Sequence, residues 1–220
     1  MTEIPIPFLD ANDDLTPFPR PENAMTEPNG LLMAGANLKP ERLILAYRQG
    51  IFPWYSEGEP ILWWSPDPRC IIWPEQIKVR RSLQKTIKKQ QFTVSHNAAF
   101  GRVIENCGVP RQGSDGTWIT ADMTEAYCEL ARRGVAESIE VWSDDELVGG
   151  LYGVVVGRVF VGESMFSKKS DASKIALVTL ATCGRFDLID CQLPTEHLLN
   201  MGAVCISRTE YLSALKTLSR

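Results

Sequence analysis

SIEVWSDDELVGGLYGVVVGRVFVGESMF, residues 138–166, is the stretch of this sequence that decides its fold. It holds three runs rich in β-branched and aromatic residues, which favour strands, at 138–142, 147–156 and 159–166. The polar residues 143–146 separate the first two runs, and Gly157-Arg158 separates the last two. Short polar or glycine-containing segments of this kind are typical of hairpin turns. The stretch therefore predicts a meander of three antiparallel strands at the centre of a sheet.

Helical periodicity and capping residues predict further elements on both sides of this meander. Pro40 suits a first helical position, and Thr120 suits an N-cap. Ser170 or Asp171 is expected to cap a later helix. The expected helices cover 40–48, 117–133, 172–182, 195–201 and 209–218, and the further strands cover 187–191 and 204–206. Helices that flank a mainly antiparallel sheet give an α+β fold.

The chain is long enough for one domain of ordinary size and a small attached lobe. Its 220 residues are 44% hydrophobic and 23% charged, which is typical of a globular protein. Residues up to about Asp67 are rich in proline and aromatic side chains and hold one clear helix. We therefore expect a small N-terminal domain, 1–67, and a larger domain, 68–220.

The composition argues against export, membrane insertion and a metal site. Residues 1–20 lack both a basic start and an unbroken apolar run, so a signal peptide or membrane anchor is not expected. Glycines and Arg158 interrupt the apolar stretch 147–166. The chain has 6 cysteines without a CxxC pair and 2 histidines, which favours reduced structural thiols over a zinc site. We expect a cytoplasmic protein without a metal or an organic cofactor.

A basic segment, QIKVRRSLQKTIKKQQ at 76–91, contrasts with a chain whose net charge is -4. It contains no acidic residue. A helix that begins near Ser82 would place four cations on a single face, namely Arg81, Lys85, Lys88 and Lys89. Such a stripe predicts binding to the phosphate backbone of a nucleic acid, without contacts to base edges. An ordinary lysine-rich surface is the alternative.

Aromatic rings and prolines are interspersed in the segment IFPWYSEGEPILWWSPDPR, 51–69. Prolines stiffen such a loop, so its rings have fixed positions. Trp54 is a candidate platform for a ligand ring. Trp63 and Trp64 are expected instead to fill the joint between the two lobes, because large aromatic side chains dominate burial at such contacts.

Several motifs, in one order along nearly the whole chain, match those of a known protein family. They are EPNGLL from Glu27, PERL-x3-YR-x-GIFPWYS from Pro40, ILWWSPDPR from Ile61, DGTWIT from Asp115, SIEVW from Ser138, ELVGGLYGV from Glu146, GESMFS from Gly162, DASK from Asp171 and LIDCQ from Leu188. On these motifs the chain resembles the leucyl/phenylalanyl-tRNA–protein transferase family. So many long motifs in order are far more specific than any single short pattern.

The resemblance implies a fold, a reaction and two partners. It implies a small N-terminal lobe and a catalytic lobe similar to the acetyltransferase (GNAT) fold. The implied reaction moves leucine or phenylalanine, and methionine less well, from an aminoacyl-tRNA onto the N-terminal arginine or lysine of an acceptor protein. The new peptide bond marks the acceptor for N-end rule degradation. No metal, cofactor or membrane is implied.

The resemblance also implies site residues where the motifs coincide. Asp190 and Gln192 of LIDCQ correspond to the proposed catalytic pair. Trp54 and Trp118 correspond to rings that hold the terminal adenosine of the tRNA. Glu163 of GESMFS is placed near the reacting groups. The other expected substrate-binding residues are Tyr127 and, around the pocket for the transferred side chain, Leu151, Phe160, Met165, Leu177, Leu180 and Ile189.

The chemistry of such a donor explains why no nucleophile motif is present. An aminoacyl ester is already activated, so the main requirement is to align an attacking amine with the ester carbonyl. The sequence has no GxSxG and no credible Cys-His pair, which favours direct attack by the amine. We expect Asp190 to orient Gln192, whose carbonyl oxygen aligns the amine while the proton leaves through water or the tRNA hydroxyl. Glu163 and Asp190 are also expected to attract the basic N-terminus.

Other interpretations stay open at this point. Asp190 can be a strand-end acid that caps a helix, and Glu163 can pair with an arginine across strands. An acyl-coenzyme A acetyltransferase has a similar sheet, but SKKSDA at 167–172 lacks the glycine that lets a backbone approach pyrophosphate. A tRNA-binding module without catalysis would keep the basic segment 76–91 and have no use for Asp190 and Gln192.

Overall fold

The computed structural model describes residues 6–14, 16–109, 117 and 119–219 of the chain. The strands are β1 (Phe8–Leu9), β2 (Leu31–Gly35), β3 (Phe52–Pro53), β4 (Leu62–Trp64), β5 (Arg69–Ile72), β6 (Thr93–His96), β7 (Ala136–Ser143), β8 (Glu146–Val156), β9 (Val159–Ser167), β10 (Leu188–Gln192) and β11 (Val204–Ile206). The helices are α1 (Pro40–Arg48), α2 (Arg81–Lys88), α3 (Phe100–Cys107), α4 (Ala121–Arg132), α5 (Ala172–Thr182), α6 (Glu196–Asn200) and α7 (Arg208–Leu218).

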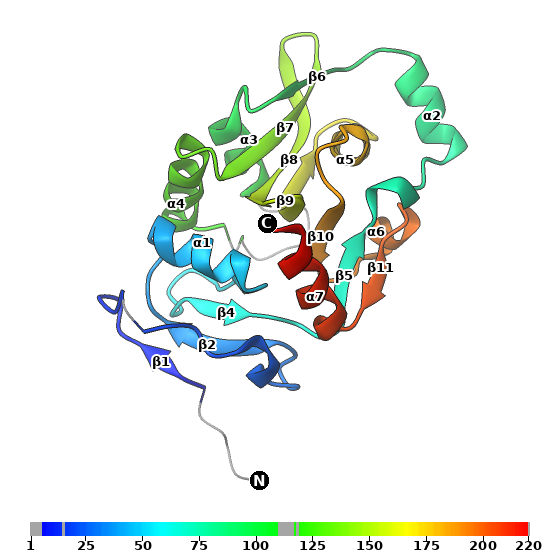
Figure 1. Ribbon diagram of the computed structural model, residues 1–220. Coiled ribbons are helices and arrows are strands. Elements are labelled where there is room, and N and C mark those ends of the chain that lie inside the picture. Colours follow the sequence, from blue (N-terminus) through cyan, green and yellow to red (C-terminus); the bar gives the residue numbers. More distant parts are fainter. Residues whose placement is uncertain (1–5, 15, 110–116, 118, 220) are drawn as a thin grey trace.

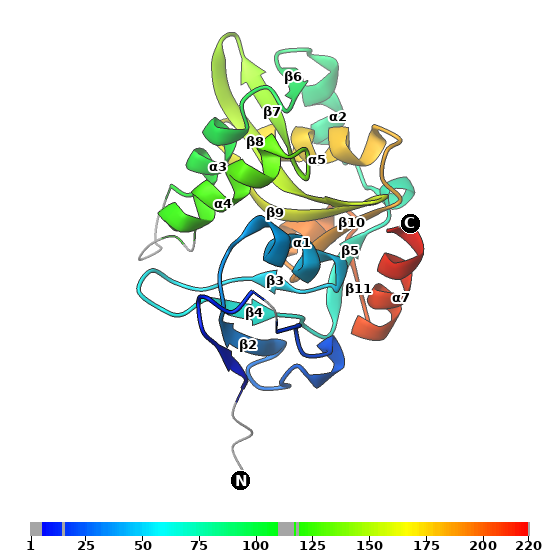
Figure 2. The same ribbon diagram turned by 60° about the vertical axis from the view of Figure 1, so that its left-hand side comes forward.

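These strands form two sheets, with helices on both faces of the larger one (Figure 1). The smaller sheet has the order β1-β2-β4-β3, and the larger has the order β11-β5-β10-β9-β8-β7-β6. Figure 2 shows the smaller sheet below α1, with α3 and α4 on one side of the larger sheet and α5 on the other. The predicted α+β class, with a mainly antiparallel sheet flanked by helices, is confirmed.

The meander predicted over 138–166 is formed by β7, β8 and β9. Both pairings are antiparallel and run from the hairpin Ser143↔Glu146 to the hairpin Val156↔Val159. The second hairpin turns at Gly157, whose φ of 60° lies in the left-handed region that glycine adopts without strain. The chain then passes through α5 and returns as β10, which pairs in parallel with β9. This crossover brings the end of β10 beside the middle of β9.

Two hydrophobic cores lie on opposite faces of the larger sheet. Side chains alternate between the faces along β8, so that Tyr152 and Val154 belong to the core under α3 and α4, whereas Leu151 belongs to the core under α5. The first core continues into the N-terminal lobe through Tyr47 of α1 and Trp63 of β4. One continuous core therefore joins the lobe to the larger sheet.

The N-terminal sheet is an element that the sequence analysis did not predict. Trp63 of β4 is fully buried, and its Nε1 donates to the Gly35 carbonyl oxygen at 2.9 Å. Its ring meets Phe18 edge to face, with ring centroids 4.8 Å apart. Trp64 is half-buried and donates from Nε1 to the Trp54 carbonyl oxygen at 2.7 Å. Trp63 thus belongs to the core that both lobes share.

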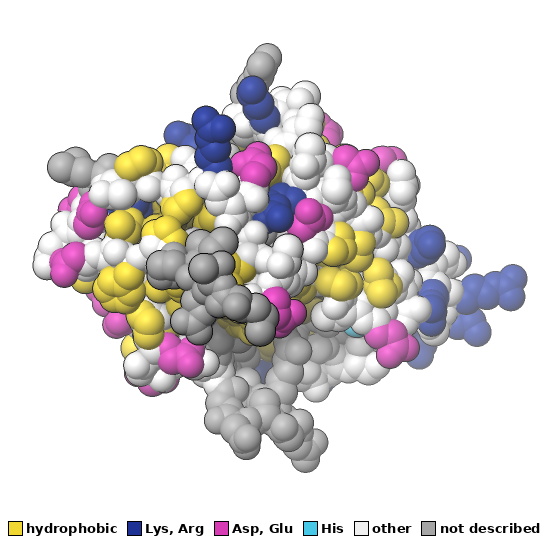
Figure 3. Space-filling model, turned by 90° about the horizontal axis from the view of Figure 1, so that it is seen from below, with side chains coloured by type: hydrophobic (Ala, Val, Ile, Leu, Met, Phe, Trp, Pro, Cys, Tyr) yellow, Lys and Arg dark blue, Asp and Glu magenta, His cyan; other side chains and the backbone are white. Residues whose placement is uncertain are grey.

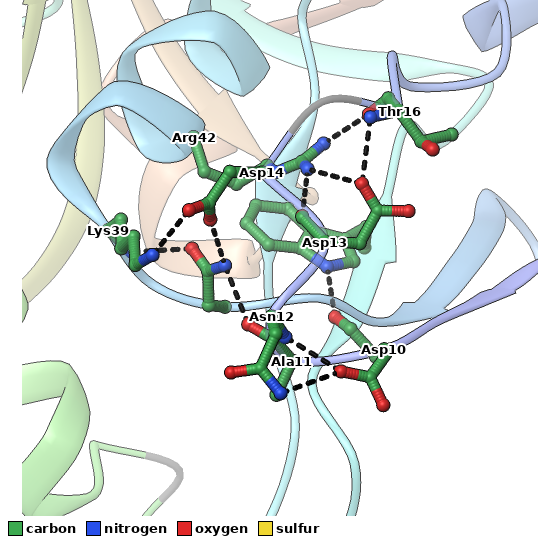
Figure 4. Close-up of polar contacts among 11 residues, drawn as sticks. Asp10, Ala11, Asn12, Asp13, Asp14, Thr16, Lys39 and Arg42 are labelled. Atoms are coloured by element: carbon green, nitrogen blue, oxygen red, sulfur yellow. Dashed lines mark hydrogen bonds and ion pairs between the residues drawn. The ribbon is translucent and has the colours of Figure 1, made fainter.

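Polar contacts hold the N-terminal arm against α1 (Figure 4). Arg42 is buried, and its Nη1 donates to the Thr16 carbonyl oxygen at 2.6 Å. Asn37 donates from Nδ2 to the Ala11 carbonyl oxygen at 2.9 Å and to Asp14 Oδ1 at 2.8 Å. Backbone oxygens of the arm and the Asp14 carboxylate therefore fix it against the segment 37–42.

The helix starts follow the predicted caps with one difference. Thr120 caps α4 as predicted, because its Oγ1 accepts from the Met123 backbone N at 3.2 Å. Asp171 occupies the N-cap position of α5, but its carboxylate accepts from Lys174 Nζ at 2.8 Å and from Thr86 Oγ1 at 2.9 Å instead of from the helix backbone. Asp171 thereby ties α5 to α2. No helix within the described ranges has the length and apolar character needed to cross a membrane.

Gly149 of β8 lies against the start of α5. A Cβ atom at Gly149 would lie 2.5 Å from the Cβ of Ala172 and 3.0 Å from the Ala172 backbone carbon. We expect Gly149→Ala to lower the free energy of unfolding by about 1–3 kcal/mol through overpacking. The melting temperature should fall by about 2–4 °C for each kcal/mol. Thermal unfolding followed by circular dichroism measures the change.

Gly101→Ala in α3 is the matched control for this substitution. A Cβ atom at Gly101 meets no atom within 4 Å, and a helix favours alanine over glycine. This variant should be as stable as the native chain or more stable. Equal melting temperatures for the two variants would contradict the packing argument.

Candidate active site

A cavity of about 870 Å³ opens between β8, β9, β10, α5 and α6. Its walls bring together all the apolar residues predicted for a side-chain pocket, namely Leu151, Phe160, Met165, Leu177, Leu180 and Ile189. Glu163, Asp190 and Gln192 line the same cavity. The fold therefore places the predicted apolar pocket next to the predicted reactive residues.

Asp190 of β10 is fully buried in an ion pair with Arg69 of β5. Arg69 donates from Nε to Oδ1 at 2.8 Å and from Nη2 to Oδ2 at 2.7 Å, so the contact is bidentate. The Tyr211 hydroxyl of α7 donates to the same Oδ2 at 2.7 Å. The Asp190 charge raises the pKa of Arg69 further above its ordinary value, although burial opposes the shift. Asp190 caps no helix, and its carboxylate is already engaged by protein donors.

Gln192 ends β10 at a bulge that changes the direction of the strand. Pairing with β5 shifts between Asp190 and Gln192, and Gln192 has φ of 62° in the left-handed region. Its backbone N donates to Asp190 Oδ1 at 2.9 Å, which fixes the bulge. Its side-chain Nε2 donates to Glu163 Oε1 at 2.8 Å. Asp190 thus orients Gln192 through the backbone, and Glu163 orients the amide group.

Glu163 of β9 is a buried carboxylate held by hydroxyl and amide donors. The Tyr127 hydroxyl of α4 donates to Oε2 at 3.1 Å. Burial raises the pKa of Glu163 to about 7, with a further contribution from the charge of Asp190, while hydrogen bonds from Tyr47 and Tyr127 oppose the shift. Within the described parts of the chain, Glu163 forms no ion pair, so the alternative in which it pairs with an arginine across strands is not found.

Tyr47 and Arg69 are site residues that the sequence analysis did not single out. The Tyr47 hydroxyl is hydrogen-bonded to the Tyr127 hydroxyl, so α1 of the N-terminal lobe reaches the Glu163 cluster. Tyr47 and Arg69 both belong to motifs that carry the family resemblance, PERL-x3-YR and ILWWSPDPR. That membership is the signal that points to them, whereas Tyr211 lies in none of those motifs.

Trp54 lies on an exposed part of the loop after β3 and does not line the cavity. Its side chain is 42% exposed, and its ring lies 5.7 Å from that of Trp64 between centroids. The neighbouring Tyr55 hydroxyl contacts Thr120 Oγ1 at 3.3 Å, which holds this loop at the start of α4. Trp118, the second predicted ring, lies outside the described residues.

The predicted basic helix is confirmed as α2, which begins one residue earlier than expected. Its single buried residue is Leu83. Figure 3 shows Lys and Arg side chains projecting together from the right-hand edge, the side on which α2 lies in Figure 1. None of the four predicted cations forms an ion pair with any residue that the structure describes: Arg81, Lys85, Lys88 and Lys89. An exposed stripe of this kind attracts phosphate groups.

The arrangement has the groups needed to align an amine and remove its proton. A carboxylate whose pKa is about 7 exchanges protons readily near neutral pH, and the amide beside it is a fixed acceptor. Among the residues that the structure describes, no group of three or more His, Cys, Asp or Glu side chains is placed to hold a metal ion.

Comparison with known proteins assigns the chain to a family. The model described as leucyl/phenylalanyl-tRNA protein transferase matches residues 71–216, and the model of the N-terminal domain of that protein matches 36–67. Curated relatives named leucyl/phenylalanyl-tRNA–protein transferase, from Pseudomonas putida and Azoarcus sp., are 55% and 54% identical. Those alignments cover 92% and 96% of this chain and 91% and 90% of the relatives. The chain belongs to the leucyl/phenylalanyl-tRNA protein transferase family.

Membership confirms the resemblance drawn from the motifs. A leucyl/phenylalanyl-tRNA protein transferase is an aminoacyltransferase, whose donor is an aminoacyl-tRNA and whose acceptor is a protein. Among solved structures, the chain resembles a GCN5-related N-acetyltransferase from Kribbella flavida, with a TM-score of 0.36 and 11% identity. That match covers 74% of this chain and 59% of the other.

Glu163 should make the stability of this transferase depend on pH. Its pKa rises from an ordinary value of 4.5 to about 7 on folding, so the folded chain binds more protons between these pH values. Stability should therefore fall as the pH rises from about 4.5 through about 7. Glu163→Gln cannot titrate and escapes this loss. The melting temperature of the variant minus that of the native chain should increase between about pH 5 and about pH 8.

Glu146→Gln on the exposed start of β8 controls for the loss of a negative charge as such. The melting temperature of this variant minus that of the native chain should change little over the same pH range. If the melting-temperature difference for Glu163→Gln were also constant over this pH range, burial would not raise the pKa of Glu163.

Proposed function

We propose that this chain transfers leucine or phenylalanine, and methionine less well, from an aminoacyl-tRNA to the N-terminal arginine or lysine of an acceptor protein. The observation that carries the proposal is an apolar cavity that ends at a hydrogen-bonded pair, the buried Glu163 carboxylate and the half-buried Gln192 amide. The product is marked for N-end rule degradation. A charged-tRNA donor places the reaction in the cytoplasm.

The apolar wall of the cavity is the proposed site of the transferred side chain. Leucine, phenylalanine and methionine all gain from leaving water for such a wall, whereas a polar side chain would lose hydrogen bonds there. One methylene group changes binding by only about 1–3 kcal/mol, so the wall discriminates weakly among apolar residues. Loose preference within the apolar class follows from this geometry.

Gln192 and Glu163 have different roles toward the attacking amine: Gln192 aligns the amine, and Glu163 accepts its proton. Because Gln192 Nε2 donates a hydrogen bond to Glu163, the Gln192 Oε1 is oriented to accept a hydrogen bond from the amine. Glu163, with a pKa of about 7, takes the proton that a neutral amide cannot hold. The C–N bond forms as the ester C–O bond breaks, and the proton passes to the leaving ribose oxygen. Glu163 replaces water and the tRNA hydroxyl as the first proton acceptor.

Asp190 acts through position rather than by contact with the amine. Its carboxylate is engaged by Arg69, Tyr211 and the Gln192 backbone, so the attraction of a basic N-terminus falls to Glu163. The ion pair holds Gln192 at the end of β10, where Gln192 aligns the amine with the ester carbonyl. Alignment of two reactants contributes up to about 7–11 kcal/mol in favourable cases.

The tRNA is proposed to lie along α2, with its terminal adenosine at Trp54 and Trp118. The exposure of the α2 cations and of the Trp54 ring supports this assignment. We also propose the division into a small domain, 1–67, and a catalytic domain, 68–220. The smaller sheet ends at Trp64 and the larger begins at Arg69, which supports a boundary between them.

A transfer assay tests the proposed reaction directly. Radiolabelled phenylalanine on tRNA should appear on a peptide that begins with arginine, and not on the same peptide with an acetylated N-terminus. Gln192→Glu should retain measurable transfer, because two adjacent carboxyl groups can share one proton and so keep an acceptor oxygen beside Glu163. Asp190→Asn should lose most transfer, since it weakens the bidentate contact that positions Gln192. Its melting temperature, measured in parallel, separates misalignment from unfolding.

No labelling of the peptide while the charged tRNA stays intact would sink the proposal. Binding of charged tRNA without any transfer would favour a tRNA-binding module. Heat released on titration with acetyl-coenzyme A, together with no transfer, would favour an acyl-coenzyme A acetyltransferase.

The α2 stripe should govern affinity for tRNA and not the chemical step. We expect Lys85→Ala combined with Lys88→Ala to raise the KM for charged tRNA severalfold with kcat nearly unchanged. The slope of log binding constant against log salt should become smaller by about 1–2, because two phosphate contacts are lost. Lys216→Ala, an exposed lysine on α7, is the control and should change neither value. An equal fall in kcat would place α2 in the reaction instead.

A further inference from the structure

The edge of the larger sheet brings three of the cysteines to one place. Cys70 lies on β5 and is directly opposite Cys205 on β11 in the antiparallel register. On the other side of β5, Cys191 occupies the bulge of β10 next to Gln192, the residue that pairs with Cys70. Paired residues of adjacent strands project their side chains on the same face. No sequence motif joins these cysteines, so the cluster exists only in the fold.

The three thiols differ in exposure and in charge. Cys70 is fully buried, Cys191 is half-buried and Cys205 is exposed. Hydrogen bonds from the Cys191 and Cys205 thiols lower the pKa of Cys70, although burial opposes the shift. Burial raises the pKa of the Cys205 thiol, and the charge on Cys70 raises it further. The cluster therefore favours the thiolate of its central sulfur more than an isolated buried site would, and it presents one sulfur to solvent.

Neither metal binding nor independent structural roles account well for this arrangement. Among the described residues, no group of three or more His, Cys, Asp or Glu side chains is placed to hold a metal ion, and that includes these three cysteines. A buried thiol without partners is inert and has a raised pKa, which is the reverse of Cys70. A nucleophilic sulfur beside an exposed sulfur is instead the pairing that resolves an oxidised cysteine.

We propose that Cys70 and Cys205 form a modification site at which a hydroperoxide produces a reversible cross-strand disulfide. The thiolate form of the exposed Cys205 attacks the hydroperoxide, so that a sulfenic acid forms and the O–O bond breaks. The departing oxygen takes up the proton that the Cys205 thiol gave up and leaves as water or an alcohol. The Cys70 thiolate then attacks the Cys205 sulfur, so that the S–S bond forms and the S–O bond breaks. The hydroxide that leaves takes up a proton to become water. Two thiols supply the two electrons.

The backbone is compatible with this bond. Residues directly opposite in an antiparallel pair have Cα atoms about 4.5–5.5 Å apart. That separation lies within the range of about 4.4–6.8 Å that disulfides span. Cys191 stays outside the bond, and with it the segment that carries Asp190 and Gln192.

The disulfide would act on the weakest side of the larger sheet. Strand β11 has 3 residues, lies at the edge and pairs with β5 alone in the order of the sheet. Edge strands of this length are held by few hydrogen bonds and open first. A covalent link to β5 closes a long loop of the chain and restricts the unfolded state. The oxidised form should therefore resist thermal unfolding better than the reduced form.

Mass spectrometry of the full-length chain tests the site without reference to transferase activity. The chain is treated with hydrogen peroxide, its remaining thiols are alkylated, and it is digested without reduction. We expect a peptide pair that joins Cys70 to Cys205, two hydrogens lighter than its parts, with Cys191 alkylated. Dithiothreitol should separate the pair, and the melting temperature should rise by several degrees in the oxidised form.

Cys205→Ser is the diagnostic variant because its side chain is exposed and the fold does not depend on it. It should form no disulfide and show no rise in melting temperature, whereas Cys183→Ser, at the end of α5, should keep both. A bond between Cys70 and Cys191, or oxidation of Cys205 to sulfinic acid without a bond, would overturn the proposal. Since no substrate is used, failure here leaves the proposed reaction untouched.

Discussion

The buried ion pair between Arg69 and Asp190 is the interaction on which the rest of this structure depends. It joins two strands that are far apart in the sequence, and it is sealed by Tyr211 of α7 and Phe52 of β3. The Arg69 guanidinium lies over both rings, 4.8 Å from the Phe52 centroid and 4.6 Å from that of Tyr211. Loss of either charge would leave the other unpaired in the interior, at a cost of about 3–5 kcal/mol. The same Asp190 carboxylate accepts from the Gln192 backbone N, so the stability of the fold and the position of Gln192 share one origin.

Two carboxylates close to each other have opposite environments in this site. Asp190 is matched by a guanidinium in a bidentate ion pair, whereas Glu163 has hydroxyl and amide donors and a pKa of about 7. The two acids therefore differ in their partners: a cation faces Asp190, and neutral donors face Glu163. Tyr47 brings the N-terminal lobe into the same network through Tyr127. The lobe is thus part of the site and not an appendage to it.

Local patterns predicted the elements whose periodicity is long and whose ends carry specific residues. The meander over β7, β8 and β9, the cap at Thr120 and the proline at the start of α1 are of this kind. The smaller sheet escaped prediction because β1 and β3 have 2 residues each, too few to show an alternation. In the sequence, strand β5 is only a short apolar run. It lies between β10 and β11 because it pairs with residues that are distant in the sequence. Short strands are defined by their neighbours, and neighbours are not visible in a local window.

Sequence alone determined the family, the apolar residues of the pocket, the basic stripe of α2 and the candidate pair Asp190 and Gln192, because each rests on residue type and order. Tertiary structure alone decided that Asp190 is paired with a guanidinium and that Glu163 has a pKa of about 7. Burial and the identity of the facing group set a pKa, and both depend on contacts between distant segments. For the same reason, the three cysteines at the sheet edge show no pattern in the sequence and meet only when β5, β10 and β11 pair.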